Sequence, residues 1–136
     1  MIRKPKLDPE VQKDLTRLCD FDADLVKALA THGVSVRVPQ GWSIMTEMTP
    51  ADSAYILLDG SVEIRKSGEV RGTLEPGDMF GEIGLVDHRL RSASVIASTD
   101  ITALRLEASA IQALIELNPT FADTLKTTAA NRLESF

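Results

Sequence analysis

The sequence predicts a mainly β domain in which an antiparallel roll of short strands is flanked by helices. Three observations favour this fold class. Apolar residues recur at helical spacing in the first and last quarters, short alternating segments fill the middle, and turn residues separate those segments. A length of 136 residues with 43% apolar residues is enough for one domain with its own core.

The first quarter predicts two short helices. Asp8 and Pro9 have the residue types of an N-cap and a first helical position, and Asp22 is a second N-cap. His32 and Gly33 are expected to end the second helix. The apolar stripes of the two helices are Val11, Leu15 and Leu18, and Leu25, Val26 and Leu29.

The middle of the chain predicts short antiparallel strands joined by turns. V-S-V-R-V alternates apolar and polar residues, which is typical of a strand with one buried face, whereas Y-I-L-L is apolar on both sides. Pairs such as Asp59-Gly60 and Ser67-Gly68 favour tight turns. The strands are expected at 34–38, from Trp42 onwards, and at 55–58, 62–65, 70–74, 93–97 and 101–106.

The last quarter returns to helical spacing. Ser109 is the predicted N-cap of one helix, and Asn118-Pro119 interrupts the pattern before a last helix that begins at Thr120. The inner faces are expected to be Ile111, Leu114, Ile115 and Leu117, and then Phe121, Leu125, Ala129 and Leu133.

Bulk properties exclude several classes of protein. A net charge of −5 with scattered basic residues argues against non-specific binding to nucleic acid. No apolar run approaches the roughly 20 residues that span a bilayer, and the first residues lack the apolar core of a signal peptide. The single cysteine, Cys19, excludes an internal disulfide and fits a reducing cytoplasm. We therefore expect a cytoplasmic protein, with Cys19, Trp42 and Tyr55 in packing roles.

The stretch from Gly77 to Val95, G-D-M-F-G-E-I-G-L-V-D-H-R-L-R-S-A-S-V, has the composition of an anion site. It holds three of the chain's eight glycines, one carboxylate (Glu82) among apolar neighbours, and the arginines Arg89 and Arg91. Glycines let backbone amides approach a ligand closely, and an arginine can hold a phosphate through two donors. The small residues that directly follow Arg91 favour it over Arg89 as the phosphate partner.

These segments, in this order, resemble the cyclic nucleotide-binding domain family. The resemblance rests on P-Q-G-W, A-D-S-A-Y-I-L-L-D-G-S-V-E-I, L-E-P-G-D-M-F-G-E-I-G-L and R-S-A-S-V. It implies a jelly-roll (double-stranded β-helix) with N-terminal helices and two C-terminal helices. The implied single domain has N-terminal helices in 1–32, the β-roll in 33–107 with a phosphate-binding cassette at 80–95, and C-terminal helices in 108–136.

The resemblance also implies roles for individual residues. Glu82 would accept a hydrogen bond from the ribose 2′-hydroxyl, and Arg91 would pair with the cyclic phosphate. The amides of Gly81, Ser92 and Ala93 would supply further donors. Ile83 completes the implied ligand-binding set. One feature departs from the family, because the tip at Asp87–Leu90 lacks the glycine and proline often found there.

The final helix supplies two candidates for covering the base, Arg132 and Phe136. A solvated helix face is the alternative for Arg132, and a frayed chain end is the alternative for Phe136. Ser92 favours cyclic AMP over cyclic GMP, since in this family a threonine after the cassette arginine often marks cyclic GMP.

The predicted function is a non-enzymatic regulatory module in signal transduction. A cyclic nucleotide, cAMP or secondarily cGMP, would draw the C-terminal helix over the pocket; the alternative is a ligand-free cassette-like domain used for protein contacts. No catalytic residue, metal or other cofactor is expected, because the two histidines are far apart and neither lies in a predicted strand. We expect no nucleic-acid partner and no membrane span, and consider a homodimer through the helices. The effector protein or domain stays unidentified, as does whether 1–136 is a whole protein or an excised domain.

Overall fold

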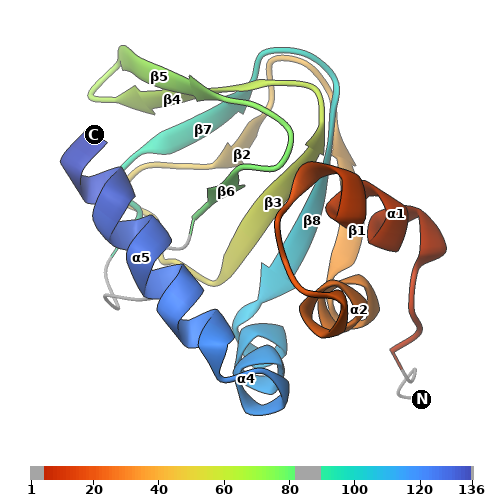
Figure 1. Cartoon of the computed structure of the whole chain (residues 1–136). Helices are drawn as coiled ribbons and strands as arrows, with labels where there is room; N and C mark the ends of the chain where they lie inside the picture. The colour runs from red at the N-terminus through yellow and green to blue at the C-terminus, as the bar shows by residue number, and fades with distance from the viewer. Residues whose placement is uncertain (1–4, 82–89, 136) are drawn as a thin grey trace.

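The computed structural model describes residues 5–81 and 90–135, with side chains of the last helix described as far as residue 127. Within these residues, four helices and eight strands follow one another as helices, strands and then helices. Figure 1 shows the strands as two facing layers, with α1 and α2 at one side and α4 and α5 following the last strand. The predicted mainly β fold with flanking helices is confirmed.

The two N-terminal helices, α1 (Pro9–Leu18) and α2 (Ala23–His32), begin where the sequence predicts. The Asp8 carboxylate accepts two backbone amides of the first turn of α1, at 3.0 and 3.3 Å. The Asp22 carboxylate accepts one amide of α2 at 2.8 Å. Both aspartates therefore satisfy amides that a helix start leaves without intrahelical partners.

The strands form two four-stranded antiparallel sheets. Sheet A has the order β1-β8-β3-β6, and sheet B has the order β2-β7-β4-β5. The strands are β1 (Val34–Val38), β2 (Ser43–Met45), β3 (Ser53–Asp59), β4 (Val62–Lys66), β5 (Glu69–Leu74), β6 (Met79–Phe80), β7 (Ser94–Ala97) and β8 (Ile101–Glu107). Strand β6 was not predicted from the sequence, because two residues cannot show an alternating pattern.

Buried apolar residues form two clusters that share sheet A. The helix-side core packs one face of β3 and β8 against the helices, and the roll core lies between the sheets. The helix-side core includes Leu15, Leu29, Ile56, Leu104, Leu114 and Phe121; the roll core includes Tyr55, Leu57, Val62, Ile64, Leu74, Phe80 and Val95. Neighbours along β3 thus alternate between the two clusters, as strand geometry requires.

The C-terminal helices are α4 (Ala108–Leu117) and α5 (Thr120–Ser135). The predicted cap at Ser109 is wrong, because β8 runs directly into α4 and Glu107 occupies the N-cap position without a side-chain cap bond. The Ala108 amide donates instead to the Asp52 carbonyl at 3.2 Å. One amide of the helix start is therefore satisfied from the loop before β3.

Two apolar residues expected inside the protein lie on its surface. Leu117, at the end of α4, is 66% exposed, because Asn118 caps the helix there and the chain turns away. Trp42 is 65% exposed. Its carbonyl accepts the Ala97 amide at 2.9 Å, so pairing fixes its backbone while the indole projects outward. Both residues contradict the packing roles predicted for them.

Cys19 and Tyr55 do pack as predicted. Tyr55 is buried in the roll core and its ring stacks on Phe80 with centroids 5.1 Å apart. Cys19 is half-buried against the helix-side core, and its Sγ lies 3.7 Å from the Gly77 carbonyl to which it donates. Burial, together with the negative charge of Asp78, raises the pKa of this thiol above its usual value.

Candidate functional site

Arg91 is the buried charged residue around which the candidate site is built. It lies just before β7, and its side chain is only 3% exposed. Its guanidinium donates to the Gly81 carbonyl and to the Ser53 carbonyl, each at 2.7 Å. A buried cation requires such partners, because leaving water without them costs several kcal/mol. The two carbonyls hold the guanidinium between the end of β6 and the start of β3.

A carboxylate and a second arginine complete this charged cluster. Asp52 Oδ1 lies 3.5 Å from the Arg91 guanidinium, and Asp52 Oδ2 lies 3.6 Å from the guanidinium of Arg105. Arg105 also faces Glu107 at 3.7 Å, further along β8. Asp52 is 71% exposed and Arg105 is 36% exposed, so the cluster runs from the buried Arg91 outward to solvent.

Gly81 has a backbone that only glycine adopts easily. Its φ is +85°, and a Cβ there would lie 2.9 Å from an Arg91 guanidinium nitrogen and 3.2 Å from the Ser53 carbonyl oxygen. The missing side chain therefore lets the Gly81 carbonyl approach Arg91 closely enough to accept its hydrogen bond. The sequence predicted Gly81 as an amide donor to a ligand; the structure also shows its carbonyl as a partner of Arg91.

The small residues after Arg91 lie in a bend between Arg91 and β7. Ser92 is exposed, whereas Ala93 is partly buried and packs against the roll core. Of the six predicted ligand-binding residues, the structure thus brings Gly81, Arg91, Ser92 and Ala93 into one region. The other two, Glu82 and Ile83, lie outside the described residues, as do Arg89 and Phe136; the side chain of Arg132 in α5 is also outside them.

A cavity of about 420 Å³ opens beside this cluster. Arg91, Asp52 and Arg105 line it together with Tyr55 and with residues of β2 and the loop that follows, including Thr46 and Thr49. The lining is mostly polar in character, and two of its side chains are cationic. The cavity can therefore admit an anionic group or water next to the buried arginine.

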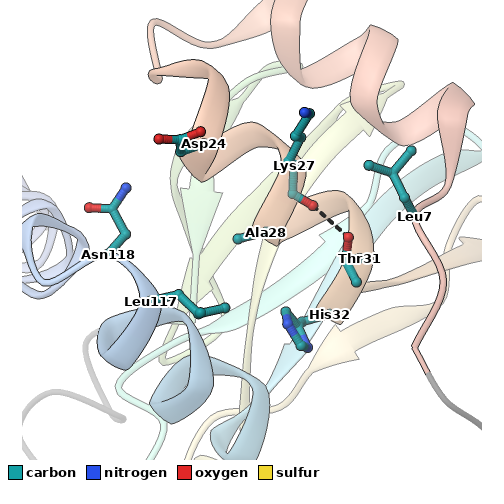
Figure 2. Close-up of a pocket in the computed structure, with 8 residues that line it drawn as sticks. All are labelled: Leu7, Asp24, Lys27, Ala28, Thr31, His32, Leu117 and Asn118. Atoms are coloured by element: carbon teal, nitrogen blue, oxygen red, sulfur yellow. Dashed lines mark hydrogen bonds between the residues drawn. The ribbon is translucent and has the colours of Figure 1, made fainter.

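A second cavity, of about 380 Å³, lies between the N-terminal segment, α2 and the end of α4. Figure 2 shows Lys27, Thr31 and His32 on α2, with Leu117 at the end of α4 on one side of them and Leu7 on the other. Among the described residues, none of the predicted ligand-binding residues lines this cavity. The exposed Leu117 side chain belongs to its wall.

Sequence reasoning missed Ser53, Asp52 and Arg105 as partners in the cluster. Asp52 and Ser53 stand in the stretch A-D-S-A-Y that was assigned only to the roll, and Arg105 stands in a strand. Their proximity to Arg91 depends on sheet A, in which Tyr55 pairs with Arg105. Nothing local in the sequence marks a contact between residues 38 positions apart, such as that between Ser53 and Arg91.

Within the part of the chain that the structure describes, no group of three or more histidine, cysteine, aspartate or glutamate side chains is arranged to hold a metal ion. Among the same residues, no helix is both long and apolar enough to cross a membrane.

Residues 35–118 match the family model of the cyclic nucleotide-binding domain. The matched segment begins at the second residue of β1 and ends at the residue after α4, so it contains the rest of β1, β2 to β8 and the Arg91 cluster. It covers more than half of the 136 residues.

Curated relatives share parts of this chain. A cAMP-dependent protein kinase regulatory subunit from Aspergillus fumigatus is 39% identical over 75 residues, which are 53% of this chain and 18% of that protein. A CRP-like cAMP-activated global transcriptional regulator from Mycobacterium tuberculosis is 30% identical over 113 residues, or 79% of this chain and 50% of that protein. The chain therefore spans half or less of the length of these two relatives.

A solved structure of Sp-2Cl-cAMPS bound to PKAR CBD2 superposes with a TM-score of 0.77 and 25% sequence identity. The superposition covers 93% of this chain and 84% of the solved one. The similarity therefore includes the flanking helices as well as the two sheets.

Proposed function

The chain belongs to the cyclic nucleotide-binding domain family, and from that premise we propose that it is a regulatory module that binds a cyclic nucleotide and catalyses no reaction. The observation that carries the proposal is the buried guanidinium of Arg91, held in place by two backbone carbonyls. A cyclic phosphodiester carries one negative charge, which one fixed arginine can match. Preorganising that arginine lowers the entropy cost of binding.

The roles of the remaining site residues are part of the same proposal. Arg91 pairs with the cyclic phosphate, and the amides of Gly81, Ser92 and Ala93 add neutral donors. Glu82 accepts the ribose 2′-hydroxyl, because a carboxylate would repel the phosphate and must lie on the sugar side.

Cyclic AMP is the proposed ligand and cyclic GMP the second choice. Ser92 follows the cassette arginine, where a threonine often marks a preference for cyclic GMP. Two relatives are described by name as cAMP-dependent or cAMP-activated, which supports the same choice. The two relatives differ in what they control, since one is a kinase regulatory subunit and the other regulates transcription.

The proposed output is a movement of α5 when the ligand binds. The first turns of α5 are anchored, with Phe121 fully buried and Leu125 nearly so. In Figure 1 the helix then continues away from α4 toward the ends of β4 and β5 in this view. Arg132 or Phe136, near the end of the chain, would cover the base. Such a movement requires that the ligand bind the two helix positions with different affinity.

Isothermal titration calorimetry with cyclic AMP tests the proposal directly. We expect saturable binding with one ligand per chain, and weaker binding of cyclic GMP. Arg91→Ala should lose about 2–5 kcal/mol of binding free energy, because the phosphate would be left without its charge partner. Arg71→Ala, which removes an exposed arginine of β5, is the matched control and should bind normally.

The outcomes separate ligand binding from the competing function. Absence of binding to the wild-type chain would leave the ligand-free interaction domain as the better account. Arg91→Ala also removes two hydrogen bonds to the backbone, so its unfolding should be measured alongside Arg91→Lys, which keeps the charge. Normal affinity in a folded Arg91→Ala variant would transfer the phosphate role to another residue, with Arg89 the first candidate.

A further inference from the structure

Asp52 is shared by two arginines with different surroundings. Its Oδ1 faces the buried Arg91 at 3.5 Å, and its Oδ2 faces the partly exposed Arg105 at 3.6 Å. Oδ1 also accepts the Ser53 hydroxyl at 2.9 Å. A single carboxylate thus lies between two cations, and the strength of its pairing with one depends on its pairing with the other.

Arg105 is poorly satisfied in its present position. Its contacts with Asp52 and Glu107, at 3.6 and 3.7 Å, are longer than hydrogen bonds. Its Nε is buried and has no hydrogen-bond partner within the described part of the chain. An unsatisfied buried donor lowers stability, so the local contacts of Arg105 do not explain why an arginine occupies this position in β8.

Arg105 lies at the cavity beside Arg91. On sheet A, Arg105 pairs with Tyr55, whose ring belongs to the roll core, and both residues line the 420 Å³ cavity beside Arg91. Arg105 therefore lies at the same cavity as Arg91 and shares with it the Asp52 carboxylate.

We propose that Arg105 is a positioning residue for Arg91: by drawing on the Asp52 carboxylate, it limits how strongly that carboxylate holds and neutralises the phosphate-binding guanidinium. The inference rests on the proposed function, because it describes how this chain tunes the same site. Arg105 itself contacts no ligand in this account.

Two effects of removing Arg105 have the same sign. Asp52 would pair with Arg91 alone, and a closer carboxylate partly cancels the positive charge that the phosphate needs. The direct loss of positive potential in the cavity is the smaller effect, because solvent screens the charge of the partly exposed Arg105. Arg105→Gln should therefore weaken cyclic AMP binding, by about three- to tenfold, since Asp52 is largely exposed and solvent screens its interactions.

The experiment compares Arg105→Gln, Arg105→Lys and the control Arg71→Gln in titrations with cyclic AMP and with adenosine. Arg105→Lys keeps the charge and should restore most of the affinity. Arg71→Gln removes an exposed arginine paired with Glu69 on β5 and should leave affinity unchanged. Adenosine lacks the phosphate, so any weak binding of it should not respond to Arg105→Gln.

A double-mutant cycle tests the path through Asp52. In an Asp52→Asn background, Arg105→Gln should change cyclic AMP affinity by less than about twofold, because the shared carboxylate is gone. Without any ligand, the NMR signal of the Arg91 Nε–H group should shift in Arg105→Gln and should shift little in Arg71→Gln. That signal reports Arg91 even if the ligand were not cyclic AMP.

The outcomes are distinct from those of the proposed function. A wild-type chain that binds no cyclic nucleotide contradicts the function, whereas the NMR comparison still decides whether Arg105 acts on Arg91. A wild-type chain that binds normally, with Arg105→Gln equal to Arg71→Gln, overturns the inference. An equal loss in the Asp52→Asn background overturns it too, because Arg105 would then act without the carboxylate.

Discussion

Gly81 and Arg91 are in such close contact that the backbone of one decides the position of the other. The Gly81 carbonyl accepts a hydrogen bond of 2.7 Å from Arg91, and that approach exists only because no Cβ stands in the way. At the scale of single residues, the glycine therefore positions Arg91, apart from the ligand contact proposed for its amide.

This contact predicts different outcomes for two glycine substitutions with similar backbones. Gly81→Ala should lower the free energy of unfolding by about 1–3 kcal/mol through strain at φ +85°, and should also displace Arg91 and weaken cyclic AMP binding. Gly41→Ala has the same strain at φ +89°, but its Cβ would meet no atom within 4 Å. Chemical denaturation and calorimetry on both variants check this. Equal affinities in the two variants would show that the contact with Arg91 does not matter for binding.

Part of the site could be predicted from the sequence because its residues are adjacent in the chain. Gly81, Arg91, Ser92 and Ala93 belong to one continuous stretch, and the chemistry of glycines and of an arginine followed by small residues can be inferred from the local sequence. Ser53, Asp52 and Arg105 could not be predicted, since sheet pairing brings them to Arg91 from distant positions. The type of a residue is visible in the local sequence, but the residues that it contacts depend on how the strands pair.

At the scale of elements, the helix starts show where local rules succeed and where packing replaces them. Asp8 and Asp22 follow segments that are neither helix nor strand, so their carboxylates can turn back to accept amides of the first helical turn. Ser109 follows a strand that runs directly into α4 and is already inside the helix. The same residue types therefore act as caps only where the chain before them is not committed to a strand.

Two alanine substitutions test this difference. Asp22→Ala removes a hydrogen bond of 2.8 Å to the Leu25 amide and should cost about 1 kcal/mol of stability. Ser109→Ala should change stability by no more than about 0.5 kcal/mol, because Ser109 is an exposed helical residue with no cap to lose. Urea unfolding of both variants measures the two losses. A larger loss for Ser109→Ala would mean that its hydroxyl does cap the helix in solution.

The existence of most strands was predicted from the sequence, but their exact first and last residues were not. All seven segments predicted as strands or as starts of strands correspond to strands of the structure. The prediction is clearest where alternation or continuous apolar character spans several residues, as in β3 and β8. β6 could not be found, because the two residues Met79-Phe80 are too short for a pattern and are defined as a strand by pairing with Tyr55-Ile56 of β3. Trp42 and Leu117 show a related limit. Apolar character alone does not predict whether a residue at the end of a helix or strand is buried or exposed.

At the scale of the whole molecule, sheet A is common to both clusters of buried residues. Ile56 belongs to the helix-side core and its neighbour Leu57 to the roll core, and neither is exposed. The helices and the roll therefore bury their apolar surfaces against opposite faces of the same strand. Loss of β3 would expose both clusters at once, which is the physical basis of cooperative unfolding.

The shared strand predicts that the helices and the roll unfold together. Ile56→Ala and Leu57→Ala should each lower the free energy of unfolding by about 2–5 kcal/mol, although they face different clusters. In each variant, far-ultraviolet circular dichroism of the helices and the near-ultraviolet signal of Tyr55, stacked on Phe80, should give the same midpoint. If Leu57→Ala melted the tyrosine signal at lower denaturant than the helix signal, the roll would be a separate unit.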